Sequence, residues 1–186
     1  DGKVLVSGGC WSAIHSSICG VRLSVDGTID VNFGAGGMVL LEQSNSNTTG
    51  GGSVVTLSDG KYLLGGNCQS YFCVIRLDSS GVPDVTFGNG TTVFTSFGSG
   101  ATAFKRIVVL PDGKFVAIGD CYLNLQAQFC LARYLADGQL DPSFGNSGRV
   151  VIQIASVVAY TTDATAEPDG RIIVIGYCSE GTGFDF

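Results

Sequence analysis

The chain has 186 residues, among them 28 glycines, 4 prolines and 7 cysteines, and its 10 basic and 16 acidic residues give a formal net charge of −6. So much glycine disfavours a helical protein, because each glycine in a helix interior costs about 1 kcal/mol relative to alanine, and a hydrophobic fraction of 45% excludes a disordered chain. The scattered lysines and arginines exclude the basic stripe that nucleic-acid binding needs, and the most apolar stretch, 149–160, is too short to span a bilayer.

An internal repeat organises the chain from its first residue. The tripeptide Asp-Gly-Lys or Asp-Gly-Arg begins at Asp1, Asp59, Asp112 and Asp169, so that successive copies start 58, 53 and 57 residues apart. An Asp-Gly pair is typical of a two-residue hairpin turn in which glycine adopts a positive φ. The repeat therefore divides the chain into units 1–58, 59–111 and 112–168, followed by a partial unit 169–186.

Each unit presents the same predicted strands in the same order. An apolar run precedes the Asp-Gly turn at 53–57, 106–110 and 162–168. Another follows it at 4–6, 62–64, 115–118 and 172–175, without the polar alternation of a half-exposed strand, so we expect it to be covered on both faces. A third strand surrounds Arg22, Arg76 or Arg133, and a Phe-Gly turn at Phe33, Phe87 or Phe144 leads into a fourth, such as 37–43 or 148–156. Four short antiparallel strands per repeat are the signature of propeller blades.

These motifs resemble the delta-60 repeat family of β-propellers over essentially the whole chain. The shared string runs from Asp-Gly-Lys through an apolar run and Arg-Leu or Arg-Tyr to Gly-x-x-Asp-x-x-Phe-Gly. The resemblance implies an all-β fold of tandem four-stranded antiparallel blades, about three and a third repeats here, in a family found mostly in secreted bacterial proteins. It implies no activity. The chain departs from the family pattern in the cysteine pair of each unit, which most members lack.

The cysteines form one pair in each complete unit, namely Cys10 with Cys19, Cys68 with Cys73, and Cys121 with Cys130. Each pair flanks the loop between the second and third strands, where opposed residues lie about 4.5–5.5 Å apart at Cα, within disulfide range. The rival interpretation is metal binding, but the separations do not match those of zinc knuckles and one histidine cannot complete a site. We expect three disulfides, and hence an oxidising, extracellular location.

Cys178 is left over, because its partner in the repeat would follow Phe186. Two interpretations remain open: the sequence is a window of a longer repeat array, or another copy completes the fourth blade. Head-to-tail addition would build a filament or a ring. We therefore expect self-association or continuation into further repeats.

An arginine and an aspartate recur eight residues apart in every complete unit, as Arg22 with Asp30, Arg76 with Asp84, and Arg133 with Asp141. A catalytic site would be a single unusual feature, whereas a pair present in every repeat predicts a structural ion pair. Calcium binding by the segments 25–30, 79–84 and 136–141 is the alternative, although none has the dense oxygen-ligand spacing of an EF-hand loop.

Other candidate sites carry weaker signals. His15 lies beside Trp11 and near Ser16 and Ser17, but the chain has no Gly-x-Ser-x-Gly motif, so we expect a solvated loop histidine. The glycines of the Phe-Gly turns precede strands, and a phosphate-binding loop precedes a helix. Two sequons, at Asn47 and Asn89, predict N-glycosylation.

These observations favour a non-catalytic structural or scaffolding module of a secreted or cell-surface protein, and they are compatible with head-to-tail assembly into a filament. The alternative is a module that binds glycan or protein through loop aromatics, since Trp11, Tyr71 and Tyr122 follow the first cysteine of successive units. A propeller hydrolase or lyase would need a cluster of histidines and carboxylates, and the chain has one histidine. We expect no enzymatic activity, no cofactor or metal, no nucleic acid and no membrane span.

Overall fold

The computed structural model describes residues 1–11, 16–41, 51–98, 100–123, 126–154, 158–179 and 184–185, and within these ranges the chain is all β. Its strands form four antiparallel sheets, each a blade. Blade 1 contains β1 (Val4–Trp11), β2 (Ser16–Leu23) and β3 (Met38–Leu41). Blade 2 contains β4 (Gly51–Thr56), β5 (Tyr62–Cys68), β6 (Tyr71–Leu77) and β7 (Thr92–Thr95). Blade 3 contains β8 (Thr102–Val109), β9 (Phe115–Leu123), β10 (Gln126–Tyr134) and β11 (Arg149–Ile152). Blade 4 contains β12 (Val158–Ala166), β13 (Ile172–Ser179) and β14 (Phe184–Asp185).

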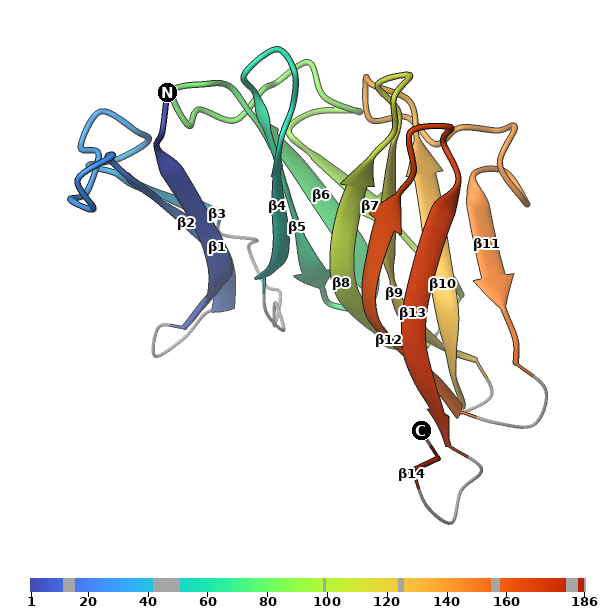
Figure 1. Ribbon diagram of the computed structural model, residues 1–186. Coiled ribbons are helices and arrows are strands. Elements are labelled where there is room, and N and C mark those ends of the chain that lie inside the picture. Colours follow the sequence, from blue (N-terminus) through green and yellow to red (C-terminus); the bar gives the residue numbers. More distant parts are fainter. Residues whose placement is uncertain are drawn as a thin grey trace.

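The blades lie side by side in chain order (Figure 1). The first strands of blades 2, 3 and 4 lie next to one another, because β8 packs against both β4 and β12. The Asp-Gly turns lie at one end of the blades, and the turn between β5 and β6 lies at the other end (Figure 1). Within the described residues, blades 2 and 3 have four strands and blades 1 and 4 have three, and this arrangement of antiparallel blades is propeller-like, as the sequence predicted.

The Asp-Gly turns form where the repeat places them, but as three-residue loops such as 58–60 and not as the two-residue turns predicted, because the Gly60 N–H bonds back to the Leu57 carbonyl. In blade 2, the Leu57 N–H donates to the Lys61 carbonyl across 2.8 Å, and Gly60 takes the positive φ of 81° that this turn requires. The Asp59 carboxylate accepts the Lys61 N–H at 3.1 Å, so the aspartate side chain also stabilises the turn. The same bonds recur at the turns of blades 3 and 4.

The sequence repeat and the blade begin at different strands. Each Asp-Gly turn joins the first strand of a blade to its second, so unit 1–58 ends with β4, which belongs to blade 2. Three predicted strands also differ in extent. The strand expected at 37–43 begins at Met38 as β3, and residues 42–43 lie outside the described ones. The strand expected at 148–156 is β11, which ends at Ile152, before the described residues 153–154. Strand β12 ends at Ala166 because Glu167 enters the turn.

Apolar layers fill the spaces between blades. Ile18 and Val39 of blade 1 pack against Leu64 and Ile75 of blade 2, and similar layers join blades 2 and 3 and blades 3 and 4. The second strands β5 and β9 are therefore buried on both faces, as predicted.

The second strands of the outermost blades differ from this expectation. Val4 and Val6 of β1 are each 53% exposed, and Ile175 of β13 is 55% exposed. Most of their equivalents in blades 2 and 3 are nearly inaccessible because a further blade covers them; Ile118 of β9 is 0% exposed, and the one exception, Tyr62 of β5, is partly buried. The burial of a second strand thus depends on its neighbouring blades as well as on its own sequence.

Candidate functional site

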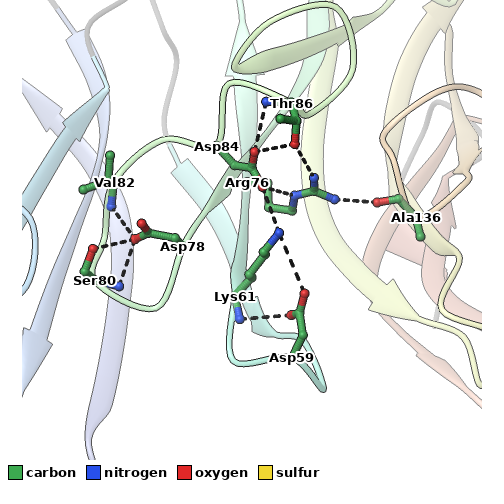
Figure 2. A network of polar contacts seen from close by, with 9 residues as sticks. All are labelled: Asp59, Lys61, Arg76, Asp78, Ser80, Val82, Asp84, Thr86 and Ala136. Atoms are coloured by element: carbon green, nitrogen blue, oxygen red, sulfur yellow. Dashed lines mark hydrogen bonds and ion pairs between the residues drawn. The ribbon is translucent and has the colours of Figure 1, made fainter.

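The repeated arginine and aspartate form the centre of a polar network at the turn end of each complete repeat. In blade 2, Arg76 of β6 donates from Nε to Oδ2 of Asp84 at 3.0 Å, and Lys61 Nζ reaches the same oxygen at 3.0 Å (Figure 2). The other carboxylate oxygen of Asp84 accepts the Thr86 N–H at 2.9 Å and the Thr86 hydroxyl at 2.6 Å. One carboxylate therefore holds two cations and orders the turn that follows it.

The same arginine reaches across to the following blade. Arg76 Nη1 donates to the Ala136 carbonyl at 2.7 Å (Figure 2), and the Gly88 N–H donates to the Asp137 carbonyl at 2.7 Å. Both acceptors belong to the turn after the third strand of blade 3. Their oxygens are main-chain carbonyls, so the contact depends on the path of the backbone.

A ring and a glycine complete this contact. The Arg76 guanidinium lies 4.8 Å from the centroid of the Phe87 ring, which is fully buried. Gly138 of the blade 3 turn, which has a φ of 92°, packs directly against the Phe87 ring. A Cβ at Gly138 would lie 2.7 Å from that ring. We call this unit a clasp: the Lys, Arg, Asp and Phe of one blade and the glycine turn of the next.

Blade 1 closes a second clasp of the same design on blade 2. Arg22 Nε donates to Asp30 Oδ2 at 2.8 Å, Lys3 reaches the same oxygen at 2.8 Å, and Arg22 Nη1 donates to the Ser79 carbonyl at 2.7 Å. The Gly34 N–H donates to the Ser80 carbonyl at 2.7 Å, and Gly81 packs on the Phe33 ring. Each of these contacts of blade 1 has a counterpart at the same repeat position of blade 2.

Blade 3 contains the first half of a third clasp. Arg133 Nε lies 3.0 Å from Asp141 Oδ2, Lys114 Nζ lies 3.1 Å from the same oxygen, and the guanidinium stands 4.4 Å from the Phe144 centroid. In the part of the chain that the structure describes, no glycine turn of a following blade contacts this half.

Hydrogen bonds and cations keep the clasp carboxylates ionised. The hydroxyl and N–H of Thr86 and the Lys61 ammonium hold the pKa of Asp84 well below its usual range. Ser143 does the same for the pKa of Asp141, and Lys3 lowers the pKa of Asp30. Each carboxylate is therefore a fully charged structural anion with its lone pairs committed to the protein, which is unlike a general acid or base poised near neutral pH.

A different polar contact joins the blades near the opposite end. Asn67 of β5 accepts the Phe104 N–H at 2.8 Å through Oδ1, and Asp120 of β9 accepts the Thr161 N–H at 2.6 Å. Both donors sit at β-bulges in the first strand of the following blade, where a main-chain N–H leaves its ladder. Burial raises the pKa of Asp120, against the opposing effect of the Thr161 hydrogen bonds.

Three disulfides tie second to third strands at this end: Cys10–Cys19, Cys68–Cys73 and Cys121–Cys130. They join the cysteines that the sequence paired, with Cα–Cα distances of 5.9, 5.8 and 5.7 Å. The expectation of directly opposed cysteines is wrong, because Cys10 pairs in register with Ser17 and Cys19 with Gly8. The bonded residues are diagonal neighbours on one face. Among the described residues, Cys178 of β13 is the free cysteine.

The remaining sequence candidates are dispersed. Asn89 is exposed in its Phe-Gly turn, whereas Asn47 and His15 lie outside the described residues. Ser17 is buried, at 4% exposure. Of the aromatics expected in equivalent positions, Tyr71 is exposed and Tyr122 is half-buried. The side chain of Trp11 is outside the described part of the chain, as is that of Ser16.

Sequence reasoning missed several members of the network. The clasp lysines, phenylalanines and glycines recur at fixed positions, so the repeat itself could have indicated them. Asn67 and Asp120 each directly precede the first cysteine of a pair, but the equivalent residue of blade 1 is Gly9. Because this position is polar in two units and glycine in the third, the repeat does not indicate a shared contact there, as it does for the clasp residues.

The described segments lack two kinds of feature. These segments gather no group of three or more His, Cys, Asp or Glu residues that could hold a metal ion. They also include no helix with the length and apolar character needed to cross a membrane.

Residues 57–87 and 110–144 match a family described as "Domain of unknown function (DUF5122) beta-propeller". Both matched segments run from the residue two positions before an Asp-Gly pair to the clasp phenylalanine, Phe87 or Phe144. They therefore contain the Lys, Arg, Asp and Phe of a clasp. No curated protein matches the chain.

Replacing Arg76 with alanine tests the clasp. We expect Arg76→Ala to lower the free energy of unfolding by about 2–3 kcal/mol, somewhat less than for a fully buried pair, because Asp84 keeps Lys61. Arg106→Ala is the matched control, since Arg106 and Asp163 form an ion pair that is half-exposed on both sides, and it should cost less than about 1 kcal/mol. Thermal unfolding followed by circular dichroism measures both; equal losses would contradict a special role for Arg76.

Replacing Asp120 with asparagine tests the second contact. Asp120→Asn keeps the oxygen that accepts the Thr161 N–H, as Asn67 does in blade 2, and removes a buried charge. Because the pKa of Asp120 is raised on folding, its ionisation costs stability as pH rises above the unfolded value of about 3.9. We expect the variant to melt about 2 °C higher at pH 7, with the gain disappearing as the pH falls to 4. A lower melting temperature at pH 7 would show that the charge itself stabilises the fold.

Proposed function

We propose that this chain is a non-catalytic structural module of a secreted or cell-surface protein, in which clasped blades form a stiff array. The observation that carries the proposal is the repetition of one clasp, atom for atom, at successive junctions. The arginines of the two complete clasps, Arg22 and Arg76, are committed to joining blades. We further infer that all four units belong to the delta-60 repeat family, and that the module extends head to tail into a filament.

The cysteine pairs support an extracellular location. Each complete unit places a disulfide at the same position of its blade, between the second and third strands. Disulfides persist in oxidising compartments and are rare in the cytosol. Exposed Asn89 is available to glycosylation machinery in such a compartment.

The location is tested on the natural protein, by fractionating the source cells and measuring intact mass without reducing agent. The account predicts recovery outside the cytosol, with a mass six hydrogens lower than after reduction, two for each disulfide. Recovery from the cytosol with all thiols free would contradict it.

A binding module is the second candidate, favoured by one exposed aromatic pair. Tyr71 and Phe94 are 39% and 47% exposed and meet edge to face, with centroids 6.3 Å apart. Phe94 also borders an open groove of about 640 Å³ together with Asn89 and Gln139. Aromatic faces suit the apolar faces of sugars or a partner's side chains. Saturable retention on immobilised glycans would distinguish this role from a purely structural one.

A further inference from the structure

The Arg149 side chain differs from the other cations of the described chain because it lacks a carboxylate partner. Every other lysine and arginine has a carboxylate oxygen within 3.9 Å, whereas Arg149 has none among the acidic side chains that the structure describes. Its Nε is buried without a hydrogen-bond acceptor. Its Nη1 donates to the Ser147 carbonyl at 3.4 Å, beyond the usual range of about 2.7–3.2 Å. The protein therefore compensates this charge poorly.

The main chain at Arg149 is firmly held, in contrast to the guanidinium. The Asn146 N–H donates to the Arg149 carbonyl at 2.8 Å, and the Arg149 N–H donates back to the Asn146 carbonyl at 3.2 Å. Arg149 also begins β11, where it pairs with Ala132 of β10. Along this strand Val150 packs into the apolar layer between blades 3 and 4. Because side chains alternate along a strand, Arg149 and Val151 face the other way, toward blade 2.

The guanidinium borders an open groove of about 540 Å³ between blades 2 and 3. Residues 96–98, which follow β7, line the groove from blade 2, and Asn146, Ser147 and Val151 line it from blade 3. Both sides belong to the blades in which four strands are described. The described residues that line the groove include no acidic one. The charge of Arg149 is therefore unopposed within it.

The polar residues at this junction do not follow the repeat. The hydroxyl groups of Thr95 and Tyr134 are hydrogen-bonded at 2.5 Å between blades 2 and 3. The equivalent residues between blades 1 and 2 are Leu41 and Leu77, which belong to an apolar layer. Burial raises the pKa of Tyr134 to about 12, against the opposing effect of the Arg149 charge. Blade packing as such does not require these polar groups, because leucines serve at the same positions.

We propose that this groove binds a glycan through a single carboxylate, that of a uronic acid residue, with Arg149 as the counter-ion. A planar guanidinium can donate two parallel hydrogen bonds to a carboxylate. Exposed Asn146 and Ser147 offer an amide and a hydroxyl to the sugar hydroxyls. Val151, which is 39% exposed, and half-buried Phe97 offer apolar surface to the C–H face of the sugar. The site goes beyond the structural role proposed above and does not depend on it.

The net charge of the protein selects among anions. The chain has a formal charge of −6, so a densely charged polyanion meets repulsion that one arginine cannot offset. A sulfated polymer is disfavoured for this reason. A uronic acid residue among neutral sugars brings one carboxylate together with several hydroxyls, which matches one guanidinium surrounded by uncharged polar groups.

A titration of the full chain with two matched sugars tests the proposal. Methyl β-glucuronide and methyl β-glucoside differ only in a carboxylate that replaces a hydroxymethyl group. In ¹H–¹⁵N NMR spectra we expect the glucuronide to shift the Arg149 Nε–H signal and the main-chain signals of residues 96–98 and Ser147. The glucoside should bind at least about tenfold more weakly, as loss of a charged hydrogen bond implies. Sodium acetate, which has the carboxylate without the sugar, should also bind more weakly than the glucuronide.

Variants separate binding from stability. Arg149→Met introduces the residue that the first unit carries there, as Met38, and should weaken glucuronide binding at least about tenfold. It should not lower the melting temperature, because it removes a buried Nε that has no acceptor. Arg106→Met is the control, since it removes one charge at a residue that pairs with Asp163, outside the groove, and binding should be unchanged. Val151→Asp leaves Arg149 in place, adds a carboxylate at an exposed position and should weaken binding similarly.

Four outcomes would overturn the proposal. They are the absence of a saturable shift with the glucuronide, equal binding of the two glycosides, equal binding of acetate and glucuronide, and glucuronide binding that both Arg149→Met and Val151→Asp leave unchanged. A lower melting temperature of Arg149→Met with unchanged binding would assign Arg149 to the packing of blades 2 and 3 instead.

Discussion

A guanidinium held on three sides connects blade 1 to blade 2, and a second one connects blade 2 to blade 3. Its Nε faces a carboxylate of its own blade, its plane lies over a phenylalanine, and Nη1 reaches a main-chain carbonyl of the following blade. Because the guanidinium is planar and its donors are fixed in direction, these partners together constrain where the next turn lies. Burying the charge is tolerable only when all of them are present. The positions of the lysine, the phenylalanine and the two glycines follow from this single requirement.

The junction between blades 2 and 3 is secured at both ends of the strands by different chemistry. At the turn end, the clasp uses charge, a ring and the missing Cβ of a glycine. At the other end, Asn67 satisfies the main-chain N–H that a β-bulge leaves without its ladder partner, and Asp120 makes the same kind of contact between blades 3 and 4. Apolar layers fill the space between. Stability in such an array is close to a sum of blade and junction terms, so each blade depends mainly on its neighbours.

The features that can be predicted from the sequence are those that depend on residues close together in the chain. The Asp-Gly turns, the cysteine pairs and the arginine–aspartate pairs have fixed short spacings and side chains that indicate their chemistry. Sequence reasoning could not reach the acceptors of Arg22 and Arg76, because a main-chain carbonyl 57 or 60 residues away carries no side-chain signal. The diagonal pairing of the cysteines depends on strand register. The exposure of Val4 and the burial of Ile118 depend on which blade lies next to each.

A double-mutant cycle across one junction tests the central claim most directly, namely that arginine and glycine turn act as one unit. Arg76→Ala and Gly138→Ala are combined, and free energies of unfolding are measured for all four proteins. A Cβ at Gly138 pushes the turn from Phe87 and so removes the Ala136 carbonyl from Arg76. The account predicts a double variant less destabilised than the sum by about 1–2 kcal/mol, whereas Arg22→Ala with Gly138→Ala adds within about 0.5 kcal/mol. If the two losses in free energy of unfolding simply add for Arg76→Ala and Gly138→Ala, the claim that arginine and glycine turn act as one unit is wrong.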